Sequence, residues 1–526
     1  MARHPARAAL ASIANARIHP RQDTMTNFSW LLDGSIVGLY LLGTMIAGVM
    51  VRRYVSRVDH FLVAGREMNV YLGIASLAAT EFGIVTCMYT AQNGYDKGFA
   101  GAVPGLAQAL AMFVIGLTGF CIKPLRESGA MTIPELFEKR FGPRIRWAAG
   151  VVIVLGGLLN MGVFLRTGGE FLVLVCGFDV KYLEITMTAL LLAVAVYTIL
   201  GGMLSVLVTD FLQFVVMSAG MLVVTGMILS QVGWDRLVGA VQTHHGAGGF
   251  NPFVNPTMGW PYVIFNLLLN AAACLTWQAV IARILSAKSA RTGQRIFTGT
   301  AFFFVCRFMI PGLWGIAALA TLAPAEVGGN TLHAMPKFLS TFLPMGMMGV
   351  LVAAMLAADM STDSSYMLTW GSVIYNDILA PFRKGAWSER KGLLVNRLIV
   401  ALIGLFLLFY GLWYPLKGDL WTYLGVTGTI YLSSMTTLVI ACCYWKGANN
   451  WGAAGAILFG ALVPVTYLVM EQLPATARLT RQIGPYYSGI ATYVLVALAM
   501  VIGSLLKPGA AGPTAGPLPS HSNQTA

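Results

Sequence analysis

The chain has 526 residues, of which 57% are hydrophobic and only 10% are charged, and its mean hydropathy is +0.71. This composition excludes an ordinary soluble domain and predicts a polytopic membrane protein. The formal net charge of +13 comes largely from basic residues in short loops between apolar segments, so it does not indicate a nucleic-acid partner. The seven cysteines have neither zinc-site spacing nor the pattern of a secreted framework, and we interpret them as packing residues.

Residues 1–30 are expected to form a disordered N-terminal extension. Met25 opens MTNFSWLLDGS, a short lead into the first apolar segment. We predict that Met25 is the true start, or that the preceding segment is dispensable, because export of its basic residues would break the positive-inside rule: Arg3, Arg7, Arg17 and Arg21.

About thirteen apolar segments follow, each long enough to cross roughly 30 Å of hydrocarbon as a helix. No strand-like alternation of about ten residues is seen, so an outer-membrane barrel is disfavoured. The expected spans are 32–51, 72–91, 102–122, 147–164, 183–200, 206–229, 262–284, 299–322, 346–368, 394–414, 420–444, 452–470 and 486–506.

Basic residues occur in alternate loops, which marks those loops as cytoplasmic. The N-terminus is therefore predicted outside and the C-terminus inside an inner, plasma-type membrane. The loop residues that carry this prediction are Arg52, Arg53, Arg57, Arg66, Lys123, Arg126, Lys139, Arg140, Arg144, Arg146, Lys288, Arg291, Arg295, Arg383, Lys384, Arg390, Lys391 and Lys446.

Five ionisable residues lie within the spans, where a charge is costly unless it faces a cavity or a partner. They are Glu81, Asp210, Arg307, Asp359 and Asp363, the last two one helical turn apart. A functional role is one interpretation of each residue. A structural ion pair, such as Arg307 with a carboxylate, is the other.

The ninth span contains AADMSTDSSYM, a hydroxyl-rich stretch within an otherwise apolar helix. Sodium prefers oxygen ligands, and residues 361, 364 and 365 share one helical face. The stretch is consistent with a cation site, and also with ordinary hydrogen bonding between helices.

Five segments resemble the sodium/solute symporter family, which includes sodium/proline, sodium/galactose, sodium/sialic acid and sodium/pantothenate carriers. The most specific is YTILGGMLSVLVTDFLQ, at 197–213. The others are DHFLVAGREMN, ARILSAKSARTG, LPMGMMGVLVAAMLAADMST and YWKGANNWGAAGAILFG, so the resemblance covers nearly the whole chain.

The resemblance implies an all-α polytopic membrane protein with the LeuT-type 5+5 inverted repeat and about thirteen transmembrane helices. The first repeat would be 72–230 and the second 231–445. An extra helix and cytoplasmic loop at 31–71 would precede them. Two further helices at 446–507 and a disordered cytoplasmic tail at 508–526 would follow.

Mapped onto the family's sodium site, the backbone carbonyls of Ala79, Phe82 and Ala358 would join the hydroxyls of Ser361 and Thr362. Gly83 beside Phe82 favours a break in the helix. Some family members carry a second sodium site, which here would use Asp210, Ser361, Ser364 and Ser365. Asp210 is alternatively a residue of the cytoplasmic gate.

The candidate solute-binding residues are Glu81, Thr86, Gln92, Arg166, Trp277 and Gln278. Arg166 would meet a substrate carboxylate or else extend to the headgroups, and Trp277 would be a lid or a packing aromatic. Sugar-carrying relatives have asparagine and tyrosine roughly where this chain has Trp277 and Ala279. The departure favours a small organic acid, amino acid or related polar metabolite over a sugar.

The sequence therefore predicts a sodium-coupled symporter that imports a small polar organic solute by alternating access. The alternatives are a sodium-coupled sugar carrier, or a channel or sensor with the same fold. No enzymatic module and no cofactor besides the sodium ion are expected. The expected partners are sodium, the solute and the lipid bilayer, without nucleic acid, and a monomer should suffice for transport.

Overall fold

The computed structural model describes residues 26–51, 58–382, 385, 387–414 and 418–507. The predicted start at Met25, the tail at 508–526 and several basic loop residues (Arg52, Arg53, Arg57, Arg383 and Lys384) lie outside the described residues. Within the described ranges the chain is helical and contains no strand beyond one isolated bridge between Met68 and Ala287. The prediction of an all-α protein is confirmed.

The long helices are α2 (Leu32–Val51), α5 (Ile84–Lys97), α6 (Val103–Thr118), α9 (Pro143–Met161), α10 (Phe164–Cys176), α11 (Leu183–Gln231), α13 (Gly259–Thr276), α15 (Ala290–Thr321), α18 (Met347–Val373), α19 (Glu389–Trp413), α20 (Leu420–Tyr444), α21 (Asn450–Gln472) and α22 (Ala477–Leu506). The shorter ones are α3 (Val58–Val63), α4 (Val70–Thr80), α7 (Ile122–Glu127), α8 (Ile133–Phe141), α12 (Trp234–His245), α14 (Gln278–Ser286), α16 (Pro324–Val327) and α17 (Ala334–Phe342).

Ten helical stretches in the described residues are long and apolar enough to cross a membrane. Two of them, Ile84–Thr118 and Val180–Gln231, each contain parts of two expected spans, so the ten stretches account for twelve of the thirteen. The remaining span is α18, whose serine, threonine and aspartate side chains lower its hydropathy. A helix with polar side chains at membrane depth must bury them inside the protein.

The expected fifth and sixth spans are the two parts of α11, which are separated by a break at Gly202 rather than by a longer loop. The chain bends within α11 at Gly202, whose φ of 54° and ψ of −151° lie outside the helical region. A side chain on Gly202 would meet the ring of Phe61 at 2.5 Å, so glycine is required both for this backbone conformation and for the close packing.

Two membrane segments are broken in mid-course. The first runs through α4 and α5 and is interrupted at residues 81–83, and the second runs through α13 and α14 and is interrupted at Trp277. Gly83 caps α5 in an extended conformation, with φ of −102° and ψ of 176°. Each break lies in the first helix of one predicted five-helix unit, as an inverted repeat requires.

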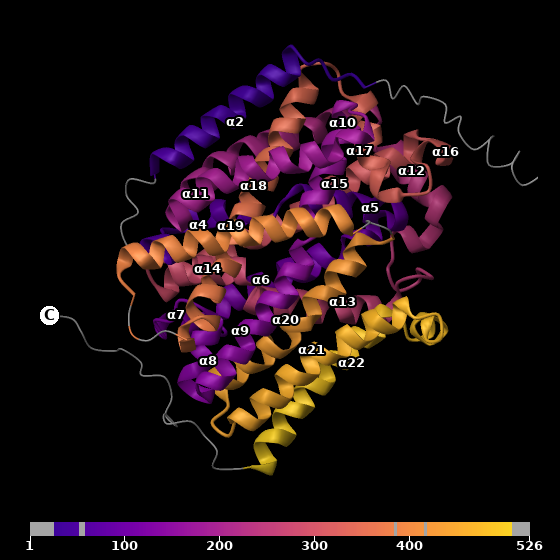
Figure 1. The fold of residues 1–526 in the computed structure, drawn as a ribbon. Helices are drawn as coiled ribbons and strands as arrows, with labels where there is room; N and C mark the ends of the chain where they lie inside the picture. The colour runs from indigo at the N-terminus through magenta and orange to yellow at the C-terminus, as the bar shows by residue number, and fades with distance from the viewer. Residues whose placement is uncertain (1–25, 52–57, 383–384, 386, 415–417, 508–526) are drawn as a thin grey trace, which may run out of the picture.

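The helix α18 lies at the centre of the bundle and packs against α2, α4, α5, α9, α10, α11 and α19. Nearly all of its side chains are buried. In Figure 1, α2 lies along one edge of the molecule, while α21 and α22 form a pair at the opposite edge. These outer helices expose apolar side chains such as Leu39 and Leu462, as expected of surfaces that face lipid.

Candidate functional site

The break between α4 and α5 lies directly against α18. The Thr362 hydroxyl donates to the backbone oxygen of Thr80 at 2.9 Å and to that of Ala358 at 3.1 Å. A side chain on Gly83 would approach Oγ1 of Thr362 to 2.8 Å, so the glycine permits this contact.

The structure therefore brings together the two segments to which the first cation site was assigned. All five residues of that site (Ala79, Phe82, Ala358, Ser361 and Thr362) are buried. The side chains they supply are hydroxyls, and the regular ladder of backbone hydrogen bonds is interrupted at the break, where the Ala79 oxygen accepts from the Phe82 amide at 3.3 Å. Such oxygens suit a hard cation of low charge.

The proposed second site is built around Asp210 of α11. Oδ1 of Asp210 accepts a hydrogen bond from Ser361 at 2.5 Å, and Oδ2 accepts one from Ser76 at 2.5 Å. Arg283 of α14 donates to the same Oδ2 at 3.0 Å, and neither side chain of this ion pair is exposed. A guanidinium group therefore neutralises the carboxylate in this conformation.

The two remaining serines of that site have different environments. Ser365 accepts a hydrogen bond from Nη2 of Arg283 at 2.6 Å, so it belongs to the cluster around Asp210. Ser364 instead donates to the backbone oxygen of Ser361. Sequence reasoning missed Arg283, although an arginine at the end of the seventh expected span is the kind of signal that singled out Arg307.

A cavity of about 80 Å³ lies between the two helix breaks. Glu81, from the first break, and Trp277, from the second, both line it, and so does Thr86. Its other polar lining residues are Tyr89, Gln108, Asn160, Asn270, Arg307, Thr362, Tyr366 and Trp421. A cavity between half-helices of two repeats is where transporters of this architecture bind their solute.

Glu81 and Arg307 form a buried ion pair in this cavity, with 3.4 Å between Oε2 and Nη1. Arg307 also donates to Gln108 and to the hydroxyl of Tyr89, each at 3.0 Å. This ion pair is the one that the sequence offered as the alternative to a functional role for Arg307. One oxygen of Glu81 (Oε1) and one nitrogen of Arg307 (Nε) have no hydrogen-bond partner, so each charged group keeps unused bonding capacity.

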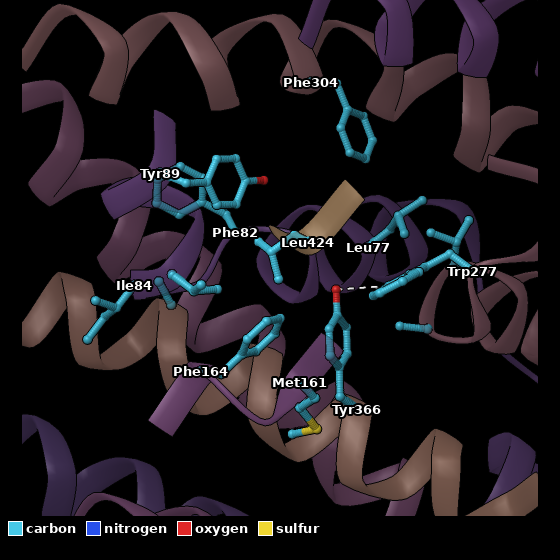
Figure 2. Packing of buried hydrophobic residues seen from close by; sticks show 14 of the residues in the cluster. Leu77, Phe82, Ile84, Tyr89, Met161, Phe164, Trp277, Phe304, Tyr366 and Leu424 are labelled. Atoms are coloured by element: carbon cyan, nitrogen blue, oxygen red, sulfur yellow. Dashed lines mark hydrogen bonds between the residues drawn. The ribbon is translucent and has the colours of Figure 1, made fainter. Parts of the chain in front are cut away.

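Aromatic rings close one side of the cavity. The indole nitrogen of Trp277 donates to the hydroxyl of Tyr366 at 2.9 Å, as the dashed line in Figure 2 shows. Phe164 packs on Tyr366 with ring centroids 5.5 Å apart. Tyr89 packs against Trp421 at 5.0 Å. A wall of this kind excludes water and offers flat surfaces for a polar solute with an apolar face.

Three predicted solute residues do not line the cavity. Gln92, in the second half of α5, donates to the backbone oxygen of Gly418 and accepts from the backbone amide of Leu420. Arg166 pairs with Glu170 at 2.9 Å and donates to a backbone oxygen of α19. Gln278 is buried next to Trp277, and its amide nitrogen has no partner.

Asp359 and Asp363 are two further acidic side chains of α18. Both are almost fully buried, and neither oxygen of Asp359 has a hydrogen-bond partner. A side chain on Gly168 would come within 3.1 Å of Oδ2 of Asp359, so the glycine makes room for this carboxylate. Asp359 and Asp363 follow Ala358 and Thr362 directly in the sequence, although consecutive residues of a helix face different directions.

Ion pairs tie the helices together at both ends of the bundle. At one end Lys97 of α5 binds Asp419, which caps α20, at 2.7 Å. At the other end Arg146 of α9 binds Asp377, which follows α18, at 2.7 Å and also bonds to Glu138. Charged contacts therefore join neighbouring helices at both ends of the bundle in this conformation.

Residues 61–460 match the family described as the sodium:solute symporter family. The chain belongs to this family. It is 28% identical over 482 residues to sodium/glucose cotransporter 4 of Danio rerio, which covers 84% of this chain and 72% of that protein. It is also 28% identical over 531 residues to sodium/mannose cotransporter SLC5A10 of Bos taurus, covering 91% and 87%.

Among solved structures, a substrate-bound, outward-open Na+-coupled sialic acid symporter superimposes with a TM-score of 0.77 at 20% identity. The match covers 91% of this chain and 98% of that one, which confirms the predicted LeuT-type fold. Membership of the family establishes sodium-coupled symport across a membrane. It leaves the transported solute open, because the relatives carry different solutes.

Proposed function

We propose that this symporter imports a small polar organic solute that carries both a positive and a negative group, as an amino acid does. The observation that carries the proposal is the buried pair of Glu81 and Arg307 in the central cavity. Their charges cancel, so a solute of zero net charge enters without leaving an unbalanced charge in a low-dielectric site. A solute ammonium would bind the open oxygen of Glu81, and a solute carboxylate would bind Arg307.

Sodium would bind to the carbonyls of Ala79, Phe82 and Ala358 and to the hydroxyls of Ser361 and Thr362. The contact of Thr362 with the break between α4 and α5 supports this assignment. Because Thr362 also lines the solute cavity, the ion would order one wall of the solute site. Such an arrangement couples the two binding events, since each ligand favours the same conformation.

Alternating access would require the charged contacts at one end to open while those at the other end stay closed. On the distribution of basic loops, the end with Arg146 and Asp377 is cytoplasmic, and the end with Lys97 and Asp419 is external. The protein would then lie in an inner, plasma-type membrane with its N-terminus outside.

A sodium-coupled sugar carrier is the second candidate. It is favoured by the amide side chains of Gln108, Asn160 and Asn270 beside the rings of Tyr89 and Trp421, which suit hydroxyl groups and the apolar face of a sugar. The names of the glucose and mannose relatives agree with this candidate.

Uptake into proteoliposomes tests the proposal. A panel of radiolabelled amino acids, organic acids and hexoses is offered under an inward sodium gradient and, as the control, under an equal potassium gradient. We expect sodium-driven accumulation of a zwitterionic amino acid. Accumulation of hexoses alone would support the second candidate, and solute uptake that is indifferent to sodium would refute coupling.

A further inference from the structure

The helices α21 and α22 enclose a groove of about 290 Å³ between them, at the edge of the bundle shown in Figure 1. It is larger than the central cavity of about 80 Å³ and shares no lining residue with it. Six of its nine lining residues are apolar or aromatic, and the other three carry hydroxyl groups. Phe459, Leu462 and Ile483 in this lining are exposed, so the groove opens onto the surface that faces lipid.

One end of the groove has a positively charged edge. Thr480 and Ile483 line the groove from the first part of α22, before the break in that helix. Arg478 and Arg481 lie in the same short segment, and both are exposed. Residues three apart are neighbours on a helix surface, so the two guanidinium groups can bind one anion together.

These two arginines depart from the charge pattern of the loops. They lie between the last two expected spans, in a connection that is external on the orientation predicted from the basic loops, and arginine is disfavoured there. The connection contains a single acid, Glu471, so its positive charge exceeds its negative charge. An anionic partner at this membrane surface would balance the excess.

A phospholipid matches both features of the groove. Its acyl chains suit an apolar cleft that opens to the bilayer, and its phosphate is an anion that guanidinium groups bind with paired hydrogen bonds. An apolar helix of a second copy would fill the groove but would supply no anion for the arginines.

We propose that each chain holds one anionic phospholipid, with an acyl chain in the groove between α21 and α22 and its headgroup at Arg478 and Arg481. The proposal is independent of the sodium ion and of the identity of the solute.

Native mass spectrometry of the purified full-length protein in detergent counts the lipids that each chain retains. The probes are dioleoyl phosphatidylglycerol, which is anionic, and dioleoyl phosphatidylcholine, which has the same acyl chains and no net charge. Wild type should prefer phosphatidylglycerol by about thirtyfold, since each arginine near an anionic lipid contributes roughly a factor of five. Arg478→Gln/Arg481→Gln should lose this preference. Arg236→Gln, at an exposed external arginine of α12, is the control and should keep it.

The groove itself is tested at Thr466, an exposed residue of its lining. Thr466→Trp places a ring in the groove and should remove the retained phosphatidylglycerol. Thr466→Val, which keeps the size of the side chain, should bind it as wild type does. Thermal unfolding establishes that the variants are folded, and if Thr466→Trp is not, the arginine variants still decide.

Equal binding of the two lipids by wild type, or an unchanged preference in the double arginine variant, would overturn the proposal. Displacement of phosphatidylglycerol by excess glycerol phosphate would also overturn it, because the headgroup alone would then be held. A wild-type mass of two copies that Thr466→Trp reduces to one would show that a second copy fills the groove instead of a lipid.

Discussion

The first cation site is tested by replacing Thr362 with alanine. In the structure the Thr362 hydroxyl contacts the backbone oxygens of Thr80 and Ala358, so its oxygen lies where α18 meets the helix break. Alanine removes this oxygen but preserves the backbone and hence the carbonyl ligands. The loss of one partner from a buried polar site costs on the order of 1–3 kcal/mol, which corresponds to a sodium affinity about ten- to hundredfold weaker.

The matched control is Thr362→Ser, which keeps the hydroxyl and removes only the methyl group that lies near Gly83. Its sodium affinity should stay within about threefold of wild type, since a difference of 1.4 kcal/mol is needed for a factor of ten. Affinity is measured by 22Na+ binding to the purified protein, and thermal unfolding establishes that both variants are folded. Equal sodium affinities for wild type, Thr362→Ser and Thr362→Ala would refute the assignment of Thr362 as a ligand.

Three further predictions concern the solute cavity, the buried aspartates and the packing of the bundle. Glu81→Gln and Arg307→Gln should each abolish solute uptake, while 22Na+ binding persists. Each substitution leaves the other charge of the pair buried without a partner, at a cost of roughly 3–5 kcal/mol. Uptake with an unaltered KM for the solute would contradict a role in solute binding. Asp359→Asn should weaken 22Na+ binding roughly tenfold, since it removes a negative charge beside Ala358 in a low-dielectric interior. The exposed-helix variant Glu184→Gln is the control, and an equal affinity in the two would show that Asp359 does not act on the ion. Gly315→Ala should prevent stable folding, because its new methyl group would lie 1.9 Å from the backbone oxygen of Ala91. Gly226→Ala is the control, because its methyl group would have no atom within 4 Å, and it should match wild type in a thermal unfolding assay.

Several features could be predicted from the sequence because the signal is local. The hydrophobic spans follow from composition within windows of about 20 residues. The break at Gly83 and the hydroxyls of Ser361 and Thr362 are carried by short motifs, so the residues assigned to the first site could be named in advance. The break at Gly202 lies within another such motif and falls between the expected spans 183–200 and 206–229, so the two separate helices could be predicted.

The tertiary structure alone decided which ionisable side chains pair. Arg283 and Asp210 are 73 residues apart, and Arg307 and Glu81 are 226 apart, so neither pairing has a local signature. The sequence also could not show that Gln92 and Arg166 lie away from the cavity, because the direction of each side chain depends on how α5 and α10 are rotated relative to the neighbouring helices. The sequence shows which charged residues lie within predicted spans, and such residues need a partner or a polar cavity. Which partner it finds depends on the register in which the helices pack, and that register is set by contacts between distant segments.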